Sequence, residues 1–191
     1  MLEAVGYKVG VTAFAKALKD TAINILGLER DLVYGSNDDK ETLTHIVWDN
    51  FPEEIRFKYA DKSKDPMSGA SMWHGPRCGP MTIREVLQVM GTDIFREMFE
   101  QDVWANSPFR SDWSEHDVVF ITDCRFPNEK RVTEERNGVT IRLLRNTGFT
   151  DNHSSEVALD DYTFERTFEN NGSLDELARF VRKTLLELEL L

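Results

Sequence analysis

The sequence predicts an α/β fold with a mostly parallel sheet. Two observations support this class: apolar runs alternate with amphipathic helical segments along the chain, and the run Val118–Ile121 is apolar at every position. Strands that alternate with helices are typical of α/β proteins, and a strand without polar alternation is expected where both faces of a sheet are covered. Since 191 residues suffice for one well-packed domain, we expect a single domain over 1–191.

The first elements are predicted from apolar periodicity and from residues that end helices. Gly6–Ala15 has the pattern of a short strand, and the helix that follows it is expected to end at Gly27. Residues 39–51 have the pattern of a further helix. The stretch 61–80 is rich in Pro, Gly and Ser and is predicted to form a long loop.

The strongest helical pattern covers residues 81–106. Thr82 and Glu85 have the spacing of a capping box at its start. The apolar residues at helical spacing, which predict a core-facing side, are Ile83, Val86, Leu87, Met90, Ile94 and Met98. Gly91 lies inside this helix, where a glycine costs about 1 kcal/mol relative to alanine. We therefore expect a kink or the close approach of another element at Gly91.

The C-terminal part of the chain repeats the alternation of strands and helices. Val118–Thr122 and Gly138–Arg145 are predicted strands, and the helix between them is expected to extend to Arg136. A last strand is predicted within 162–170. Ser173 is the expected cap of the closing amphipathic helix.

Composition and charge argue against several classes of protein. The formal net charge of −11 opposes broad binding to nucleic acids or anionic membranes. No stretch reaches the length of a membrane-spanning helix, and the N-terminal residues lack a signal pattern. Cys78 and Cys124 have no CxxC spacing, and the histidines outside the C-terminal loop have no ligand-like spacing. We therefore expect a cytoplasmic protein without a disulfide framework and without a metal site made of protein ligands.

An acid and an arginine follow the predicted strand Val118–Thr122. In open α/β sheets, ligands lie beyond the carboxyl ends of the strands, and Asp123 and Arg125 occupy that position. An acid there can hold Mg²⁺ through water or accept a substrate hydroxyl, and an arginine can bind a phosphate with its planar fork. The alternative is an Asp–Arg surface pair that closes a turn.

Two further groups of polar residues could bind a nucleotide. A polar stripe on the strongest helix consists of Arg84, Gln88, Thr92 and Arg96. A glutamine can pair with a base edge and two arginines can bracket a phosphate; the alternative is a solvated helix face. The other group, which could close over a phosphoryl group and exclude water, consists of Arg142, Arg145, His153, Ser155 and Glu156.

Five segments of the sequence together resemble the phage deoxynucleoside monophosphate kinases. In chain order they are FAKALK, TIREVLQVMGTDIFRE, VVFITDCRFPNE, IRLLR followed by DNHSSE, and NNGSLDEL. The combination of LQ-x-x-GT, TD-x-RF-x-NE and H-x-SE is specific, and the resemblance extends over about residues 6–180, except 28–80. It implies an adenylate-kinase-like P-loop fold. It also implies transfer of the γ-phosphoryl group of ATP, with Mg²⁺, to a deoxynucleoside monophosphate (dNMP), which yields a diphosphate.

The resemblance also implies roles for individual residues. The acceptor site would consist of Arg84, Gln88, Thr92 and Arg96. The catalytic residues near the phosphates would be Asp123, Arg125 and Arg145. A lid-like segment, 146–157, would contain His153, Ser155 and Glu156. Lys19 matches a lysine of the family and its role stays open. The implied partners are dNMP and ATP, with no nucleic-acid polymer and no membrane; a homodimer is left open, and a phage-encoded enzyme would act in the host cytosol.

Residues 1–191 contain no Walker A motif, G-x-x-x-x-G-K-[ST]. In the family this loop follows the first strand and binds the donor phosphates. The resemblance therefore implies that the N-terminal strand and phosphate loop are missing and that Met1 corresponds to an internal methionine. Three functions stay open: a dNMP kinase whose catalytic competence without the loop is in question, a non-catalytic nucleotide-binding or interaction protein derived from that fold, and an acidic α/β protein without a nucleotide role.

Overall fold

The chain divides into two compact units. The computed structural model describes residues 1–60, 62–64, 71–73, 75–146 and 158–191. One unit consists of Met1–Ala15 with Trp104–Leu191, and the other of Lys16–Val103. The single nucleotide-kinase-like domain over 1–191 stays a prediction.

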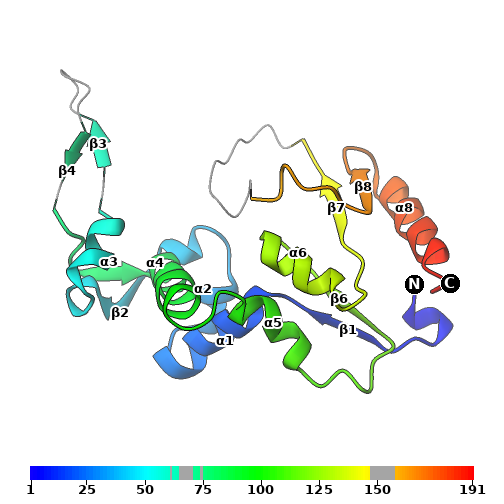
Figure 1. Ribbon diagram of the computed structural model, residues 1–191, viewed down its shortest axis with the longest axis horizontal. Helices are drawn as coiled ribbons and strands as arrows, with labels where there is room; N and C mark the ends of the chain where they lie inside the picture. The colour runs from blue at the N-terminus through cyan, green and yellow to red at the C-terminus, as the bar shows by residue number, and fades with distance from the viewer. Residues whose placement is uncertain (61, 65–70, 74, 147–157) are drawn as a thin grey trace. The chain divides into compact units, whose positions relative to one another are not determined.

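The unit Lys16–Val103 combines helices with two antiparallel strand pairs (Figure 1). Its elements in chain order are α1 (Ala15–Leu26, whose first residue belongs to the other unit), α2 (Arg30–Tyr34), η2 (Asp39–Glu41), β2 (Leu43–Val47), η3 (Trp48–Asn50), α3 (Glu53–Lys58), β3 (Lys62–Lys64), β4 (Ser71–Trp73), β5 (Pro80–Thr82), α4 (Ile83–Gln88) and the π-helix η4 (Val89–Arg96). β2 pairs with β5, and β3 pairs with β4.

Local sequence signals fix two helix ends in this unit. α1 ends at Gly27, whose φ of 68° is the left-handed conformation that glycine adopts without strain. The predicted capping box at the start of α4 is confirmed. The Thr82 side chain accepts the N–H of Glu85 at 3.2 Å, and Glu85 Oε2 accepts the N–H of Thr82 at 2.9 Å.

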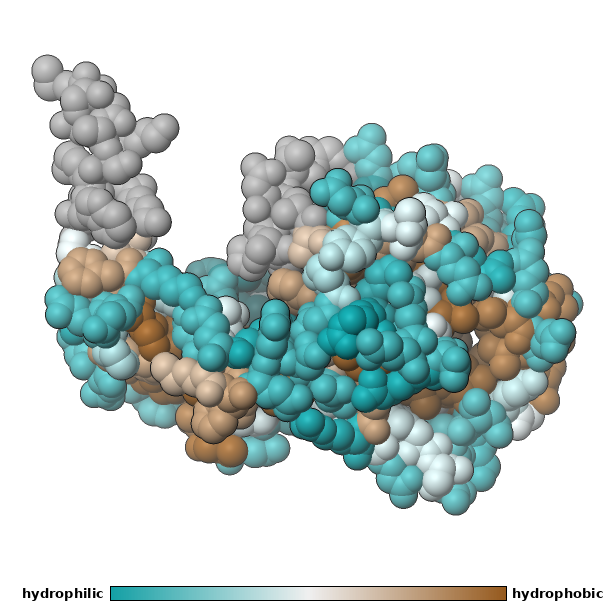
Figure 2. Space-filling view, in the orientation of Figure 1, coloured by the Kyte–Doolittle hydropathy of each residue, from teal (hydrophilic) through white to brown (hydrophobic). Residues whose placement is uncertain are grey.

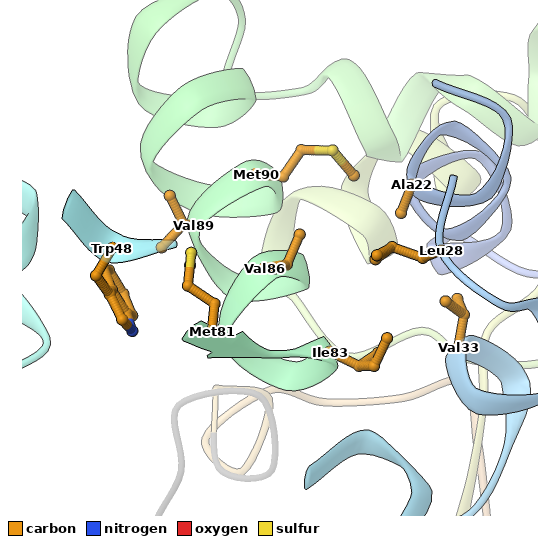
Figure 3. Close-up of a cluster of buried hydrophobic side chains, with 9 residues drawn as sticks. All are labelled: Ala22, Leu28, Val33, Trp48, Met81, Ile83, Val86, Val89 and Met90. Atoms are coloured by element: carbon orange, nitrogen blue, oxygen red, sulfur yellow. The ribbon is translucent and has the colours of Figure 1, made fainter. Parts of the chain in front are cut away.

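The core of this unit gathers around α4, with Val89 and Met81 toward Trp48 and with Ile83 toward Val33 (Figure 3). Its buried residues are Ala22, Leu28, Val33, Trp48, Met81, Ile83, Val86, Val89 and Met90. Trp48 is the largest of them and is 0% exposed. Its ring also contacts Phe51 and Tyr59, with centroid distances of 6.0 and 5.3 Å.

Two predictions for this unit are wrong. Residues 39–51 form no α-helix: η2, β2 and η3 occupy them, and β2 pairs with β5 in a register that joins Leu43 to Thr82. Strand pairing is favoured here over the predicted helix because Thr44, Ile46 and Val47 are β-branched. The stretch 61–80 is not a loop throughout, since it contains β3 and β4, and β5 begins at its last residue, Pro80. A three-residue antiparallel pair is held by backbone hydrogen bonds, which leave little pattern in the sequence.

The strongest predicted helix is shorter and less regular than its sequence indicates. α4 passes into η4, and a separate helix, α5, begins at Val103. Met98, which was expected in the core, is 65% exposed, whereas Val89 is buried. The reason is that a π-helix bonds i to i+5, which widens its turns and shifts the apolar face. The close approach expected at Gly91 is confirmed, because a Cβ there would lie 2.9 Å from Leu18 Cδ2.

The other unit contains the two parallel strand pairs (Figure 1). Its elements are η1 (Glu3–Val5), β1 (Val9–Thr12), α5 (Val103–Arg110, whose first residue belongs to the other unit), β6 (Val118–Ile121), α6 (Pro127–Glu134), β7 (Ile141–Leu144), β8 (Arg166–Glu169) and α8 (Leu174–Glu187). β1 pairs with β6, and β7 with β8. The four strands lie where the sequence predicts them, and the capping box of Ser173 and Glu176 at the start of α8 is confirmed.

This unit leaves many apolar side chains exposed. The prediction that both faces of Val118–Ile121 are covered is wrong, because no residue of β6 is buried and Phe120 is 42% exposed. Its register partner on β1, Val11, is exposed as well. Figure 2 shows further apolar side chains at the surface near the two chain ends, where Met1 and Leu186 are exposed.

The architecture is a mixed α/β arrangement with short parallel strand pairs. Parallel pairing holds for two of the four strand pairs formed by the described residues, and the other two are antiparallel. This arrangement is compatible with a P-loop kinase-like fold. Within the described parts of the chain, no helix combines the length and the apolar character that crossing a membrane requires.

Candidate active site

The carboxyl ends of β1 and β6 lie side by side. The two strands are parallel, and Thr12 is the register partner of Ile121. Thr122 continues the contact, since its N–H donates to the carbonyl oxygen of Thr12 at 3.1 Å. Asp123 follows directly. The structure therefore places this acid beyond the carboxyl ends of two parallel strands, as the sequence predicts.

Both oxygens of the Asp123 carboxylate accept backbone N–H groups. The N–H of Phe14 donates to Oδ1 at 2.6 Å, and the N–H of Ala15 donates to Oδ2 at 3.0 Å. Ala15 is the first residue of α1, where amides have no partner within the helix and an anion is favourable. Each carboxylate oxygen keeps a second acceptor site. Asp123 thus fixes the chain between β1 and α1 and can still accept a hydrogen bond from a water or a ligand.

A buried glutamate shapes the turn that carries Arg125. Glu129 is 3% exposed, and its Oε2 accepts the N–H groups of Arg125 and Phe126 at 2.8 and 3.1 Å. The Arg125 side chain is exposed. Glu129 is a site-shaping residue that the sequence interpretation missed, although its place in the first turn of α6 is a helix-start signal.

Cys124, between the two predicted catalytic residues, is a poor candidate for a nucleophile. Burial raises its pKa to about 12, and the charges of Glu129 and Asp123 act in the same direction. A thiol with such a pKa carries almost no thiolate at neutral pH, and the thiolate is the reactive form. The acid and the arginine therefore stay the candidate functional groups of this strand end.

The arginines of β7 and its end differ in their surroundings. Arg142 is tied to the segment that returns after the predicted lid, since its guanidinium donates to the carbonyl oxygen of Leu159 at 2.7 Å and lies 4.8 Å from the Phe164 ring centroid. Arg145 is exposed beyond the end of β7. Of the lid-like segment 146–157, only Asn146 is among the described residues. His153, Ser155 and Glu156 lie outside them.

The predicted acceptor stripe lies on one continuous helical segment. Arg84 and Gln88 belong to α4, and Thr92 and Arg96 to η4. Arg84 is held by Glu41, since its Nε donates to Glu41 Oε1 at 2.5 Å. Thr92 is exposed, whereas Gln88 and Arg96 are half-buried. This stripe belongs to the unit Lys16–Val103, and Asp123, Arg125 and Arg145 belong to the other unit.

A second buried acid, Asp93, was missed by the sequence interpretation. It is 2% exposed and accepts hydrogen bonds from Lys58 Nζ at 2.5 Å and from Tyr59 Oη at 2.8 Å. Asp93 lies between Met90 and Ile94 on the apolar side of the helix, and this position could have indicated from the sequence that it is buried. Since buried carboxylates require partners, an acid at such a position predicts a nearby donor.

Among the described residues, no group of three or more His, Cys, Asp and Glu side chains gathers as a metal site. Mg²⁺ that accompanies a nucleotide needs fewer protein ligands, since one or two carboxylates and the substrate phosphates hold it. Asp123 fits the role of such a carboxylate, because each of its oxygens keeps a second acceptor site beside the strand ends.

A shallow depression of about 470 Å³ lies between β8 and α8. Its lining residues are Phe168, Glu169, Gly172, Glu176, Arg179, Phe180 and Lys183. None of the predicted site residues lines it. The two phenylalanine rings stack on each other with centroids 4.2 Å apart, so their facing surfaces are already used.

The contacts of Asp123 predict the effect of its removal. Asp123→Ala is expected to destabilise the protein by about 1–3 kcal/mol, because two backbone N–H groups lose a charged acceptor. Urea unfolding of the variant measures this loss. Asp117→Ala is the matched control, since Asp117 accepts the N–H of Lys8 at 2.8 Å at the opposite end of the same strand pair. Equal stability of wild type and Asp123→Ala would contradict the two hydrogen bonds.

Comparison with known proteins identifies the family. An α/β unit with an acid and arginines at parallel strand ends defines a candidate nucleotide-binding protein. The family described as deoxynucleotide monophosphate kinase matches residues 72–181, which is more than half of the chain. The protein is also similar to the deoxynucleotide monophosphate kinase of Escherichia phage RB69, with 28% identity over 110 residues. That match covers 54% of this chain and 45% of the relative.

The chain therefore belongs to the deoxynucleotide monophosphate kinase family. This confirms the resemblance that the sequence motifs indicate. The chain spans less than half of the length of the phage relative in the matched region, so the activity of the whole relative is not established for this chain by similarity alone.

Proposed function

We propose that this protein is a deoxynucleoside monophosphate kinase, which transfers the γ-phosphoryl group of Mg²⁺-bound ATP to a dNMP. One observation carries the proposal: the family match over residues 72–181 includes every predicted site residue. These residues are Arg84, Gln88, Thr92, Arg96, Asp123, Arg125, Arg145, His153, Ser155 and Glu156. The parallel strand ends beside Asp123 support the same function, because ligands of α/β sheets lie there.

Each part of the proposed site has a physical task. Phosphoryl transfer depends mainly on positioning and charge neutralisation. On the acceptor side, Gln88 and Thr92 bind polar groups of the dNMP, and Arg96 binds its phosphate. Arg125 and Arg145 neutralise the transferring phosphate in a protein whose net charge is −11. Asp123, anchored by two amides, accepts a hydrogen bond from a substrate hydroxyl or from a water on Mg²⁺.

Arg84 contributes differently to the acceptor site. Its ion pair with Glu41 and its contact with Asn37 hold the guanidinium against the η2 region. A dNMP phosphate would have to compete with Glu41 for this group. We therefore expect the competition with Glu41 to reduce the share of Arg84 in phosphate binding.

A thermal-shift titration tests the proposed function. At a ligand concentration 100 times Kd, a bound nucleotide stabilises the folded state by about 2.7 kcal/mol. A kinase is expected to respond to a dNMP and, separately, to ATP with Mg²⁺, and to form the deoxynucleoside diphosphate when both are present. Mass spectrometry of the product detects that last step.

The same titration separates the alternatives. A response to dNMP without a response to ATP would indicate a nucleotide-binding protein that does not use the donor. No response to any of dAMP, dCMP, dGMP and dTMP would overturn the proposed function. Inorganic phosphate at the same ionic strength is the control for non-specific anion binding, which salt suppresses.

A further inference from the structure

Three consecutive residues of η4 alternate in burial. Gly91 and Asp93 are buried, and Thr92 between them is exposed. Successive residues turn by about 100° in an α-helix and by somewhat less in a π-helix, so the residues on either side of Thr92 point to roughly opposite sides of η4. Burial of both means that neighbouring elements hold η4 from two sides.

Helix α1 holds the first side at Gly91. A Cβ at this position would lie 2.9 Å from Cδ2 of Leu18, which is closer than such atoms approach each other. The absence of a side chain therefore lets α1 and η4 pack closely. Leu18 also packs against the core of the unit, which makes this contact part of a larger apolar surface.

Helix α3 and the residue after it hold the second side at Asp93. Lys58 Nζ and Tyr59 Oη each donate to one oxygen of the buried carboxylate, at 2.5 and 2.8 Å. Lys58 also donates to Glu97, one turn further along, at 2.9 Å. Burial and the bond to Asp93 raise the pKa of Tyr59, so its hydroxyl remains a donor at neutral pH. Removing a partner from a buried charge is costly, which makes this attachment strong.

We propose that Gly91 and Asp93 are positioning residues, which hold the π-helix η4 from two sides so that Thr92 and Arg96 are presented to the acceptor nucleotide. This inference rests on the proposed function. π-Helices are rare and often occur at functional sites, and one needs outside contacts to persist against the regular α-helix. The two contacts flank Thr92 directly, and Arg96 follows one turn later on the same helix.

Two mild variants test the proposal in the full chain. Tyr59→Phe removes one hydrogen bond to Asp93 and keeps the ring in the core. Gly91→Ala places a methyl group against Leu18. Each is expected to raise the Kd of the bound dNMP about 3- to 30-fold in isothermal titration calorimetry. Hydrogen exchange of residues 89–96 is expected to become about tenfold faster in Tyr59→Phe.

A matched control and a rescue separate positioning from general stability. Thr140→Val removes a buried hydroxyl that donates to Glu134 at 2.8 Å in the other unit. Its effect on stability should resemble that of Tyr59→Phe, but its Kd for dNMP should equal that of the wild type. Adding Leu18→Val to Gly91→Ala shortens the side chain that the methyl group meets and keeps an apolar contact between α1 and η4, so the double variant should bind dNMP more tightly than Gly91→Ala alone.

The outcomes distinguish this inference from the proposed function. Unchanged Kd values in Tyr59→Phe and Gly91→Ala overturn the positioning role, whether exchange is faster or not. Faster exchange with weaker binding supports it. If the wild type binds none of the four dNMPs, the proposed function fails and the positioning role falls with it. In that case, faster exchange of residues 89–96 would still show that the contact through Tyr59 holds η4.

Discussion

Replacing Arg96 with alanine is expected to raise the Kd for a dNMP by about 10- to 100-fold. A hydrogen bond to a charged group contributes about 1.5–3 kcal/mol, and 1.4 kcal/mol corresponds to a tenfold change. Arg96 is on η4, in the same helical segment as Gln88 and Thr92. Isothermal titration calorimetry of the variant with dTMP and dGMP measures the effect.

The control for this prediction is Arg30→Ala. Arg30 lies in the same unit, on α2 instead of on the helical segment of the acceptor stripe, and pairs with Asp20 at 3.4 Å. Both substitutions make the net charge more negative by one, so a purely electrostatic effect would weaken binding equally in both. Arg96→Lys keeps the charge but loses the planar fork and should have an intermediate Kd. An affinity for dNMP that is the same in Arg96→Ala and in the wild type would remove Arg96 from the site.

Elements that depend on local chemistry could be predicted from the sequence. The capping boxes at Thr82 and Ser173 formed as expected, because their donors and acceptors lie within three residues of each other. The end of α1 at Gly27 has the same local origin. Three strands of the parallel pairs, β1, β6 and β7, contain apolar stretches that stand out in the sequence, whereas β8 (RTFE) has one apolar residue, Phe168.

Elements that depend on distant partners could not be predicted. β2 exists because β5 pairs with it from more than thirty residues away. The π-helix depends on contacts with Leu18 and Lys58, neither of which is near it in the sequence. A periodicity that assumes regular α-helix therefore placed Met98 in the core, whereas the wider turns expose it.

The candidate site likewise combines features that local sequence predicts with contacts that depend on distant residues. The order and type of its residues were enough to indicate the family, since motifs preserve spacing. Their contacts were not predictable. Asp123 accepts hydrogen bonds from Phe14 and Ala15, which are more than one hundred residues away in the chain. The ion pair of Arg84 with Glu41 likewise joins a helix to a turn that was predicted to be helical.

Trp48→Ala is expected to cause the largest loss of stability, about 3–5 kcal/mol. Large-to-small changes at fully buried aromatic residues leave a cavity that surrounding side chains fill only in part. Trp48 is fully buried, and its Nε1–H donates to Glu85 Oε2 at 3.3 Å. Glu85 also closes the capping box of α4 and pairs with Arg77. The substitution therefore removes core packing and loosens the start of the helix that carries the acceptor stripe.

Segment-resolved hydrogen exchange in low urea measures which helices and strands lose stability in this variant. In Trp48→Ala, exchange should accelerate most in α4 and β5, since Glu85 and Met81 lie in these elements. Leu185→Ala, at a buried position of α8, is the matched control in the other unit and should accelerate exchange there first. Because α4 leads directly into η4, Trp48→Ala should also weaken dNMP binding more than Leu185→Ala does. Equal effects of the two variants on dNMP binding would mean that the acceptor stripe does not depend on the core of its own unit.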